Sequence, residues 1–235
     1  MFHRAAQLVR KNVKKLNVTT FHAFGLKLIK KYANQMGFKN GISIADPSDQ
    51  LAILKSSLKK ITYDTKKFDP EVLLSRISRA KNNGYSSYPK HYDRDDIDAI
   101  MPGLMSDYQS KLKQNGLVDF DDLLLLPLQL LQKEKEIALT ESLLYQYIMV
   151  DEYQDTNTIQ DAMLRELASY HRNVCVVGDD DQSIYGWRGA ESKNILEFDQ
   201  KWQNCKIITL EQNYRSTKNI LSAANAVIHN NTVRK

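Results

Sequence analysis

Cysteine is scarce in this sequence, which has only Cys175 and Cys205 among its 235 residues. Each of them lies in an apolar run typical of a buried strand. Two such cysteines do not make a disulfide framework or a zinc site. We therefore expect both side chains to be buried and the protein to work in a reducing cytoplasm.

Long apolar runs are absent as well. No stretch reaches the roughly 18 apolar residues that a membrane-spanning helix needs. The most apolar run, Leu123 to Leu131, is interrupted by Pro127 and Gln129 and predicts a core helix. The N-terminal residues contain no apolar signal-peptide region, so we expect neither membrane insertion nor secretion.

Acidic residues are missing from the first part of the chain, where nine Lys or Arg residues precede the first acid, Asp46. The net charge of the whole chain is a mild +5, so the excess of positive charge is local. This asymmetry indicates a polyanionic partner near the N-terminal segment, and a solvated basic helix face explains it equally well when taken alone.

The hydrophobic periodicity changes along the chain. Residues 3–36 predict a helix, a short strand at 17–20 and a second helix. Residues 46–145 show helical periodicity and no convincing strand, with loop-forming sequences at 82–89 and 113–116. This middle section predicts an all-helical module.

From Tyr147 onward, short apolar runs alternate with helical patterns. The predicted strands are 147–151, 173–179 and 205–210, and the predicted helices are about 156–169 and 216–229. Continuously apolar strands separated by helices are typical of a parallel sheet covered on both faces. The sequence therefore predicts an α/β domain with a helical insertion.

Acidic residues follow two of these predicted strands. Asp151 and Glu152 end the first, and Asp179, Asp180 and Asp181 follow the second. Ligands of an open parallel sheet bind beyond the carboxyl ends of its strands. Acids gathered there repel one another unless a cation or proton neutralises them. Mg²⁺, which favours one or two carboxylates together with phosphate oxygens, fits these residue types.

Helix capping is the alternative explanation for part of this stretch. Asp155 or Asn157 could cap the following helix, and Gln160 three residues after Asn157 resembles a capping box. Capping does not account for Asp151 or Glu152, so the nucleotide and metal interpretation is favoured for that pair.

Five ordered segments resemble the ATP-binding core of superfamily 1A DNA helicases of the UvrD/PcrA/Rep type, with Rep and UvrD the most similar. They are TTFHAFG (19–25), VDFDDLLLLP (118–127), VDEYQDTN (150–157), GDDDQSIYGWRGA (178–190) and LEQNYRS (210–216). The resemblance implies a partial RecA-like parallel-sheet domain of the P-loop NTPase type with a large all-helical insertion. Its implied divisions are 1–25 and 146–212 for the first motor domain, 26–145 for the insertion and 213–235 for the start of the second motor domain.

The resemblance also implies roles in ATP hydrolysis. Asp151 would hold Mg²⁺ on the phosphates, and Glu152 would orient and deprotonate the attacking water. Gln182 would contact the γ-phosphate, Arg215 would serve as an arginine finger, and Tyr214 would stack on the nucleotide base.

The GDDDQSIYGWRGA segment is similar to the family's DNA-contacting loop. Trp187 would stack on a base of single-stranded DNA, an interaction that does not depend on base sequence, and Tyr185 of the same loop would also bind the DNA. Arg188 would lie between the DNA site and the ATP site.

Two further segments resemble DNA-contacting motifs of the family. Phe120 resembles another stacking residue, and a core phenylalanine is the alternative. Thr20 and His22 match a motif that touches the DNA backbone. A lone histidine is usually structural, so the role of His22 rests on the motif.

The resemblance implies ATP-dependent 3′ to 5′ translocation on single-stranded DNA and unwinding at single-strand/duplex junctions. It places this activity in DNA replication or repair, and we expect partner proteins from those processes. The expected location is the cytoplasm, in association with the nucleoid. One family element is lacking, because no G-x-x-x-x-G-K-[ST] phosphate-binding loop occurs in the sequence. We therefore expect a fragment that, without the missing helicase segments, binds ATP weakly or not at all and does not unwind DNA.

Two alternatives to an ATP-hydrolysing fragment stay open. The first is a non-catalytic DNA-binding module derived from a helicase. The second is the helicase subunit of a helicase-nuclease complex. The presence of Asp151, Glu152, Gln182 and Arg215 favours hydrolysis, because a module that does not hydrolyse ATP has no need of them.

Overall fold

The structure is a computed structural model and describes residues 6–7, 16–39, 41–61, 67–89 and 96–231. These residues form two pairs of short parallel strands and many helices. The fold class is therefore mixed α/β with parallel strands, as the sequence predicts. The chain separates into two compact units, Met1–Glu134 and Lys135–Lys235. The helix predicted from residue 3 and most of the basic N-terminal run lie outside the described residues.

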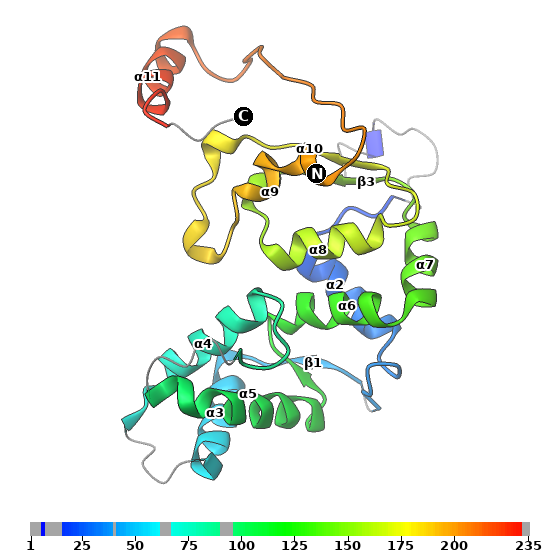
Figure 1. Cartoon of the computed structure of the whole chain (residues 1–235), viewed down its shortest axis with the longest axis vertical. Helices are drawn as coiled ribbons and strands as arrows, with labels where there is room; N and C mark the ends of the chain where they lie inside the picture. Colours follow the sequence, from blue (N-terminus) through cyan, green and yellow to red (C-terminus); the bar gives the residue numbers. More distant parts are fainter. Residues whose placement is uncertain (1–5, 8–15, 40, 62–66, 90–95, 232–235) are drawn as a thin grey trace. The chain divides into compact units, whose positions relative to one another are not determined.

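The first unit is mostly helical (Figure 1). Its described elements are α2 (Phe21–Lys31), β1 (Ser43–Ile44), α3 (Pro47–Ile61), α4 (Pro70–Asn82), α5 (Asp96–Gln114), β2 (Leu117–Val118) and α6 (Asp122–Lys133). Apolar faces of α3, α4 and α5 form one core, in which Leu54, Leu73 and Tyr108 are fully buried. A smaller core joins α2 to α6 through Ile29 and Leu123.

Helix α2 begins at a capping residue and not after a strand. Thr20 is extended and its Oγ1 accepts a hydrogen bond from the N–H of Ala23 at 3.3 Å, which satisfies one of the free donors of the first turn. The strand predicted at 17–20 is wrong, because these residues pair with no strand in the described chain. Their extended conformation leads into the cap.

A strand does occur in the section expected to have none. Leu117–Val118 pairs in parallel with Ser43–Ile44. Two residues are too few for a period of two to be visible in the sequence, so the expectation of a strand-free section was wrong at this point. The pair fixes the entry to α3 and the exit from α5.

Helices α2 and α6 approach each other closely at Gly25. A Cβ atom placed on Gly25 would lie 1.7 Å from the carbonyl oxygen of Leu123. Only glycine allows that approach. The leucine-rich run does form a core helix, since Leu124, Leu125 and Leu131 are buried along α6.

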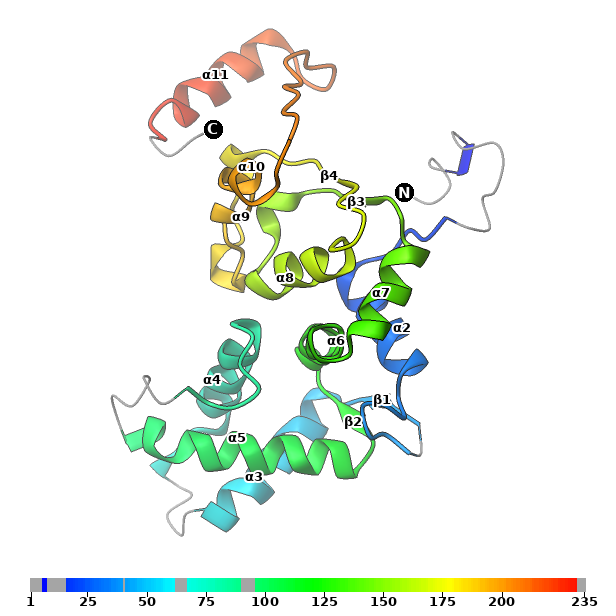
Figure 2. The same cartoon turned by 45° about the vertical axis from the view of Figure 1, so that its right-hand side comes forward.

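The second unit contains the β3–β4 pair, with helix α8 packed beside it in both ribbon views (Figure 2). Its elements are α7 (Lys135–Leu144), β3 (Ile148–Val150), η4 (Tyr153–Asp155), α8 (Thr158–Leu167), β4 (Val174–Val176), η5 (Asp180–Gln182), η6 (Gly186–Arg188), α9 (Lys193–Leu196), α10 (Phe198–Lys201) and α11 (Lys218–Ile228). Asn157 caps α8 and exchanges hydrogen bonds with Gln160, which confirms the capping box.

The β3–β4 pair is covered on one face only. Val150 is 8% exposed, whereas its neighbour Met149 is 76% exposed. Met149 pairs with Cys175, which is also exposed, while Cys205 is half-buried. Successive side chains alternate between the faces of a sheet, so this pair lies on the uncovered face. The expectations of a sheet covered on both faces and of two buried cysteines were wrong.

The third predicted strand does not form. Residues 205–210 have no regular structure, and Ile207, Ile208 and Leu210 are largely exposed. Their apolar, β-branched composition suits a strand, but a strand needs a neighbour for its backbone hydrogen bonds, and the described residues supply none here. Helix α11 forms as predicted, with no buried residue.

No helix within the described ranges is long and apolar enough to pass through a membrane. The four segments implied by the resemblance, and the three boundaries between them, stay predictions.

Candidate functional site

Acidic residues from two strands lie at one edge of the β3–β4 pair. Asp151 and Glu152 follow β3, and Asp179 follows β4. The N–H of Val177 donates to the Val150 carbonyl at 2.8 Å, and the N–H of Tyr153 donates to the Val177 carbonyl at 3.0 Å. These bonds extend the parallel pairing past the strand ends and bring the acidic segments side by side.

Glu152 has a left-handed backbone, with φ of 52°. Such a conformation costs a non-glycine residue roughly 1–3 kcal/mol and persists only where its surroundings impose it. Here the N–H of Glu152 donates to Asp151 Oδ1 at 3.1 Å, and the Glu152 carbonyl accepts from the N–H of Asp155 at 3.0 Å. The sharp turn directs both carboxylates to the surface, since both residues are exposed.

Gln154, which was not among the predicted site residues, connects the two acidic segments. Its side chain is 1% exposed. The amide nitrogen donates to Glu152 Oε2 at 2.7 Å, and the amide oxygen accepts from the N–H of Asp179 at 3.1 Å. Its position two residues after Glu152, within the same motif, is the only signal that the sequence offers.

Gly178 leaves the space that Gln154 occupies. A Cβ atom on Gly178 would lie 2.5 Å from Gln154 Oε1 and 2.7 Å from Ile195 Cδ1. Beyond this glycine, the Asp179 carboxylate accepts hydrogen bonds from the N–H of Asp181 at 3.1 Å and from the side-chain amide of Gln182. One chain of hydrogen bonds therefore runs from Glu152 through Gln154 and Asp179 to Gln182. The link between Gln154 and Asp179 uses the backbone N–H of Asp179.

The acidic edge of the β3–β4 pair could bind a cation that a phosphate group also coordinates. Within the described ranges, no three His, Cys, Asp or Glu side chains come together to hold a metal ion by themselves. Mg²⁺ needs only one or two carboxylates when phosphate oxygens and water complete its shell, so the exposed Asp151 fits that use. Burial raises the pKa of the nearby Asp155 carboxyl, and the charge of Glu152 raises it further.

The loop after η5 presents aromatic side chains to solvent. Trp187 is 74% exposed and Tyr185 is 39% exposed. The guanidinium of Arg188 lies 4.4 Å from the centroid of the Trp187 ring and 5.6 Å from that of Tyr185. A buried structural role for Trp187 is therefore excluded.

Tyr214 and Arg215 fall between the end of α10 at Lys201 and the start of α11 at Lys218. Figure 2 shows this connection as a long segment without helices. Tyr214 is 92% exposed, and the N–H of Arg215 donates to Asn213 Oδ1 at 2.9 Å. In the described chain, no hydrogen bond or ion pair joins either residue to Asp151 or Glu152. The structure thus brings Asp151, Glu152 and Gln182 together, but not these two.

In the first unit, Phe120 and His22 form a stacked pair. Their ring centroids are 4.0 Å apart and the planes differ by 21°. Phe120 is 57% exposed, which excludes the core alternative. Burial lowers the pKa of His22 below 6.5 and favours its neutral form. Thr20, two residues before His22, uses its hydroxyl to cap α2.

A buried ion cluster lies beside Phe120 and was not anticipated. Lys81 Nζ is 2.6 Å from Asp119 Oδ2 and 2.8 Å from Asp122 Oδ1, and all three side chains are buried. Burial opposes the charge of Lys81, but the two aspartates outweigh it and raise the pKa of Lys81. Burial also raises the pKa of Asp122, to about 6. A lysine in a polar helix such as α4 carries no sequence signal of burial.

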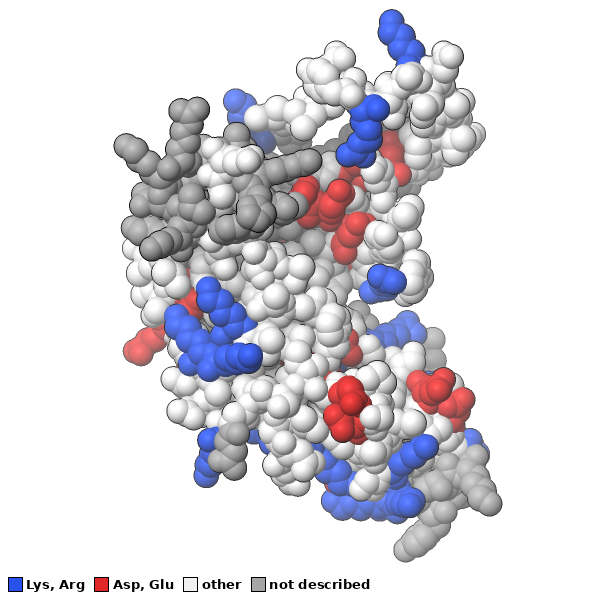
Figure 3. All heavy atoms as spheres, turned by 180° about the vertical axis from the view of Figure 1, so that it is seen from behind, with Lys and Arg blue, Asp and Glu red and all other residues white. Residues whose placement is uncertain are grey.

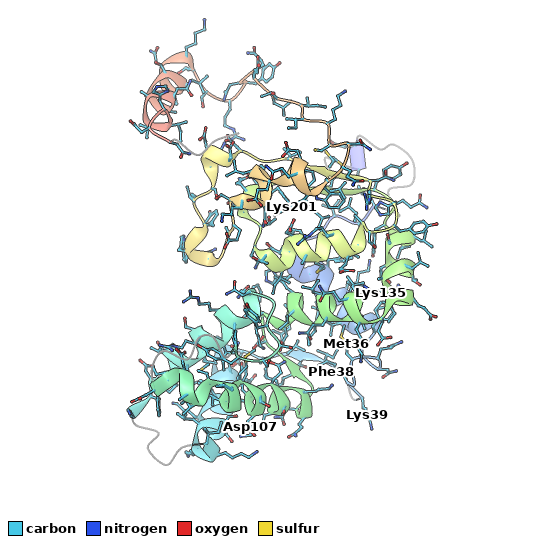
Figure 4. The ribbon with its side chains drawn as sticks, in the orientation of Figure 1. Met36, Phe38, Lys39, Asp107, Lys135 and Lys201 are labelled. Atoms are coloured by element: carbon cyan, nitrogen blue, oxygen red, sulfur yellow. The ribbon has the colours of Figure 1, made fainter. Side chains whose placement is uncertain are left out.

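A shallow hollow on the first unit contains none of the predicted site residues. It lies between the segment after α2 and the end of α5, where Figure 4 labels Phe38 and Lys39. Its lining residues are Gly37, Phe38, Lys39, Ser110, Lys113, Gln114 and Gly116. On the face shown in Figure 3, Lys and Arg side chains form separate groups and not one continuous stripe.

Comparison with known proteins gives a family match over most of the chain. The family described as UvrD/REP helicase N-terminal domain matches residues 1–203. The chain is 43% identical over 221 residues to the ATP-dependent DNA helicase PcrA of Bacillus subtilis (strain 168), covering 93% of this chain and 30% of that protein.

Two staphylococcal proteins with the same name are similarly related. PcrA of Staphylococcus aureus (strain Mu50) is 41% identical over 236 residues, covering 100% of this chain and 32% of that protein. PcrA of Staphylococcus epidermidis is 40% identical over 233 residues, covering 99% and 32%. The chain thus spans about a third of the length of these relatives.

Proposed function

Because this chain belongs to the UvrD/REP helicase family, we propose that it forms part of an ATP-dependent DNA helicase that moves 3′ to 5′ along single-stranded DNA. The observation that carries the proposal is the meeting of Asp151, Glu152 and Gln182 at one sheet edge, with Trp187 on the loop that begins there. The polarity follows from the family resemblance.

In the proposed hydrolysis, Asp151 would hold Mg²⁺, which neutralises charge on the phosphates when bound. Glu152 accepts the proton of the attacking water, and its carboxylate is held by the amide of Gln154 at 2.7 Å. Gln182 contacts the γ-phosphate. Tyr214 stacks on the base, and Arg215 places a cation on developing charge once their segment is brought to the site.

The loop from Gly178 to Ala190 offers a route from hydrolysis to DNA. Gln182 lies near its start and Trp187 near its end. A change at the γ-phosphate that releases Gln182 from Asp179 can therefore move the loop and alter the stacking of Trp187 on a base. Alternating grip of this kind moves the protein along one strand.

The proposed DNA contacts follow the same division, with Trp187 stacking on a base, Tyr185 contacting the strand beside it and Arg188 lying between the two ligands. Phe120 stacks on a further base, and Thr20 and His22 contact the backbone. We place this activity at single-strand/duplex junctions in DNA replication or repair, together with proteins of those processes, in the cytoplasm and at the nucleoid.

We propose that these 235 residues do not hydrolyse ATP, because the sequence contains no phosphate-binding loop. The test is an ATPase assay of the chain with single-stranded DNA, alone and after addition of the remaining segments of a PcrA relative. We expect activity only in the complemented sample, and we expect Glu152→Gln to abolish it.

Three outcomes distinguish part of a helicase from a non-catalytic DNA-binding module and from the helicase subunit of a helicase-nuclease complex. Robust Glu152-dependent hydrolysis by the chain alone would contradict its proposed inactivity. DNA binding with no hydrolysis after complementation would contradict the helicase and support a non-catalytic module. Nuclease activity that copurifies with the chain in a complex would indicate that the chain belongs to the helicase subunit of a helicase-nuclease complex.

A further inference from the structure

The turn formed by residues 119–122, called the acidic turn below, presents Phe120 between two anchored aspartates. The N–H of Asp119 donates to Asp122 Oδ2 at 3.2 Å, and the N–H of Asp122 donates to Asp119 Oδ1 at 2.9 Å. Both aspartates are buried, whereas the ring between them is exposed. The turn therefore closes on itself and leaves Phe120 on the outside.

Helix α4 supplies the cation that this turn requires. The ammonium of Lys81 bridges Asp119 and Asp122, and the adjacent Asn82 donates to Asp121 Oδ1 at 2.7 Å. Three carboxylates thus gather near the Lys81 ammonium, which is ion-paired with two of them. Removing one partner of a buried ion pair leaves an uncompensated charge, and like charges repel strongly there. Without Lys81, the acidic turn is expected to open.

Helix α5 holds the same turn from another direction. The hydroxyl of Tyr108 donates to Asp119 Oδ2 at 3.2 Å, and the side-chain amide of Gln109 lies within 3.1 Å of both Asp122 oxygens. The position of Phe120 is therefore set by α4 and α5 together.

The ion cluster also reduces an electrostatic conflict. A phosphate backbone is repelled by carboxylates, so acids flanking a DNA-stacking ring would weaken binding. Burial of Asp119 and Asp122 against Lys81 takes their charges out of solvent. The exposed surface at this point is then the aromatic ring together with the partly exposed Asp121.

The remaining support comes from α2. The His22 ring stacks on Phe120 at 4.0 Å, and the close approach at Gly25 brings α2 near enough for this contact. A ring that is stacked on one face and 57% exposed has its other face available for a base.

We propose that Lys81 is a positioning residue, whose ion pairs with Asp119 and Asp122 hold the acidic turn closed so that Phe120, backed by His22, stacks on a base of single-stranded DNA. This inference rests on the proposed function, because it requires Phe120 to contact DNA.

The test measures the Kd of the full chain for a fluorescent oligothymidylate. Phe120→Ala is expected to weaken binding roughly 5- to 150-fold, the range for loss of one stacked base. Lys81→Met is expected to weaken it by a comparable factor. In the double variant the loss should equal that of Phe120→Ala alone, because Lys81 acts through the ring.

Lys60→Met is the matched control. Lys60 pairs with Asp107 at the same 2.6 Å distance, but its side chain is 70% exposed; Figure 4 labels Asp107 on α5. This substitution also removes one positive charge from the first unit. It is expected to leave the Kd close to that of the unchanged chain.

Each result decides between the two proposals. An unchanged Kd for Phe120→Ala overturns the DNA role of Phe120, and this inference with it. The positioning role alone is overturned if Phe120→Ala weakens DNA binding and Lys81→Met does not. It is also overturned if the losses of affinity from the two substitutions are fully additive in the double variant. If Lys81→Met does not fold, the isosteric Asp122→Asn replaces it, with an expected roughly two- to tenfold loss that requires Phe120.

Discussion

At the scale of single residues, Glu152 shows how a backbone conformation accompanies a proposed chemical role. Its left-handed conformation places a charged side chain at the sheet edge where glycine would be the relaxed choice. The cost persists because the bonds to Asp151, Gln154 and Asp155 impose the turn. We propose that the carboxylate serves the chemistry of the site as well as the turn, since one of its oxygens accepts the Gln154 hydrogen bond.

A stability comparison tests this strain. Glu152→Gly should make the chain more stable than Glu152→Ala by about 1 kcal/mol, because only glycine adopts a positive φ without penalty. Urea unfolding of both variants measures the difference. Equal stability, or a more stable alanine variant, would show that the turn is not strained.

His22 predicts a pH dependence of stability. Its pKa is lowered by burial in the folded chain, so the unfolded chain takes up the proton first as the pH falls. The stabilisation by neutral His22 is therefore complete above pH 6.5 and is lost as the pH drops below that value. His22→Gln cannot titrate, so the stability difference between the two proteins should shrink below pH 6.5 in urea unfolding. A difference that is constant with pH would contradict the prediction.

At the scale of elements, the α2–α6 contact depends on one glycine. Gly25→Ala would put a methyl group 1.7 Å from the Leu123 carbonyl, which cannot be accommodated without separating the helices. We expect a loss of stability of several kcal/mol, beyond the roughly 1–3 kcal/mol usual for overpacking.

Gly103→Ala in α5 is the matched control. Its added Cβ would lie 3.5 Å from Ile61 Cδ1, which is an ordinary contact. The substitution should stabilise the chain by about 0.5–1 kcal/mol through helix propensity. Thermal unfolding distinguishes the two, and a destabilisation of the same size for both would contradict the close approach.

The elements predicted correctly are those with a strong local signal. The core helix from the leucine-rich run, the capping box at Asn157 and the two strands that lie within the predicted ranges 147–151 and 173–179 all follow from patterns within a few residues. Residues 205–210 have a strand composition, but pairing is a property of neighbours and cannot be read from the segment alone.

The candidate site was predictable to the same extent. Motifs pointed to Asp151, Glu152, Gln182 and Trp187, which carry the proposed chemistry. They did not reveal Lys81, because its burial results from contacts with residues 38 and 41 positions away. Side chains that support a site depend on tertiary packing, which leaves little trace in local sequence.

At the scale of the whole molecule, the chain belongs to the UvrD/REP helicase family and spans about a third of the PcrA relatives. The described residues carry exposed aromatic rings in both compact units, Phe120 in one and Trp187 in the other. We propose that these rings bind single-stranded DNA, a property that does not require the phosphate-binding loop.

The most direct test is titration of a fluorescent oligothymidylate with the whole chain at two salt concentrations, comparing Trp187→Ala with Tyr170→Ala, an exposed aromatic of the same unit outside the site. We predict binding that weakens as salt rises, a roughly 5- to 150-fold loss of affinity for Trp187→Ala and no change for Tyr170→Ala. Absence of binding, or equal effects of the two substitutions, would contradict it.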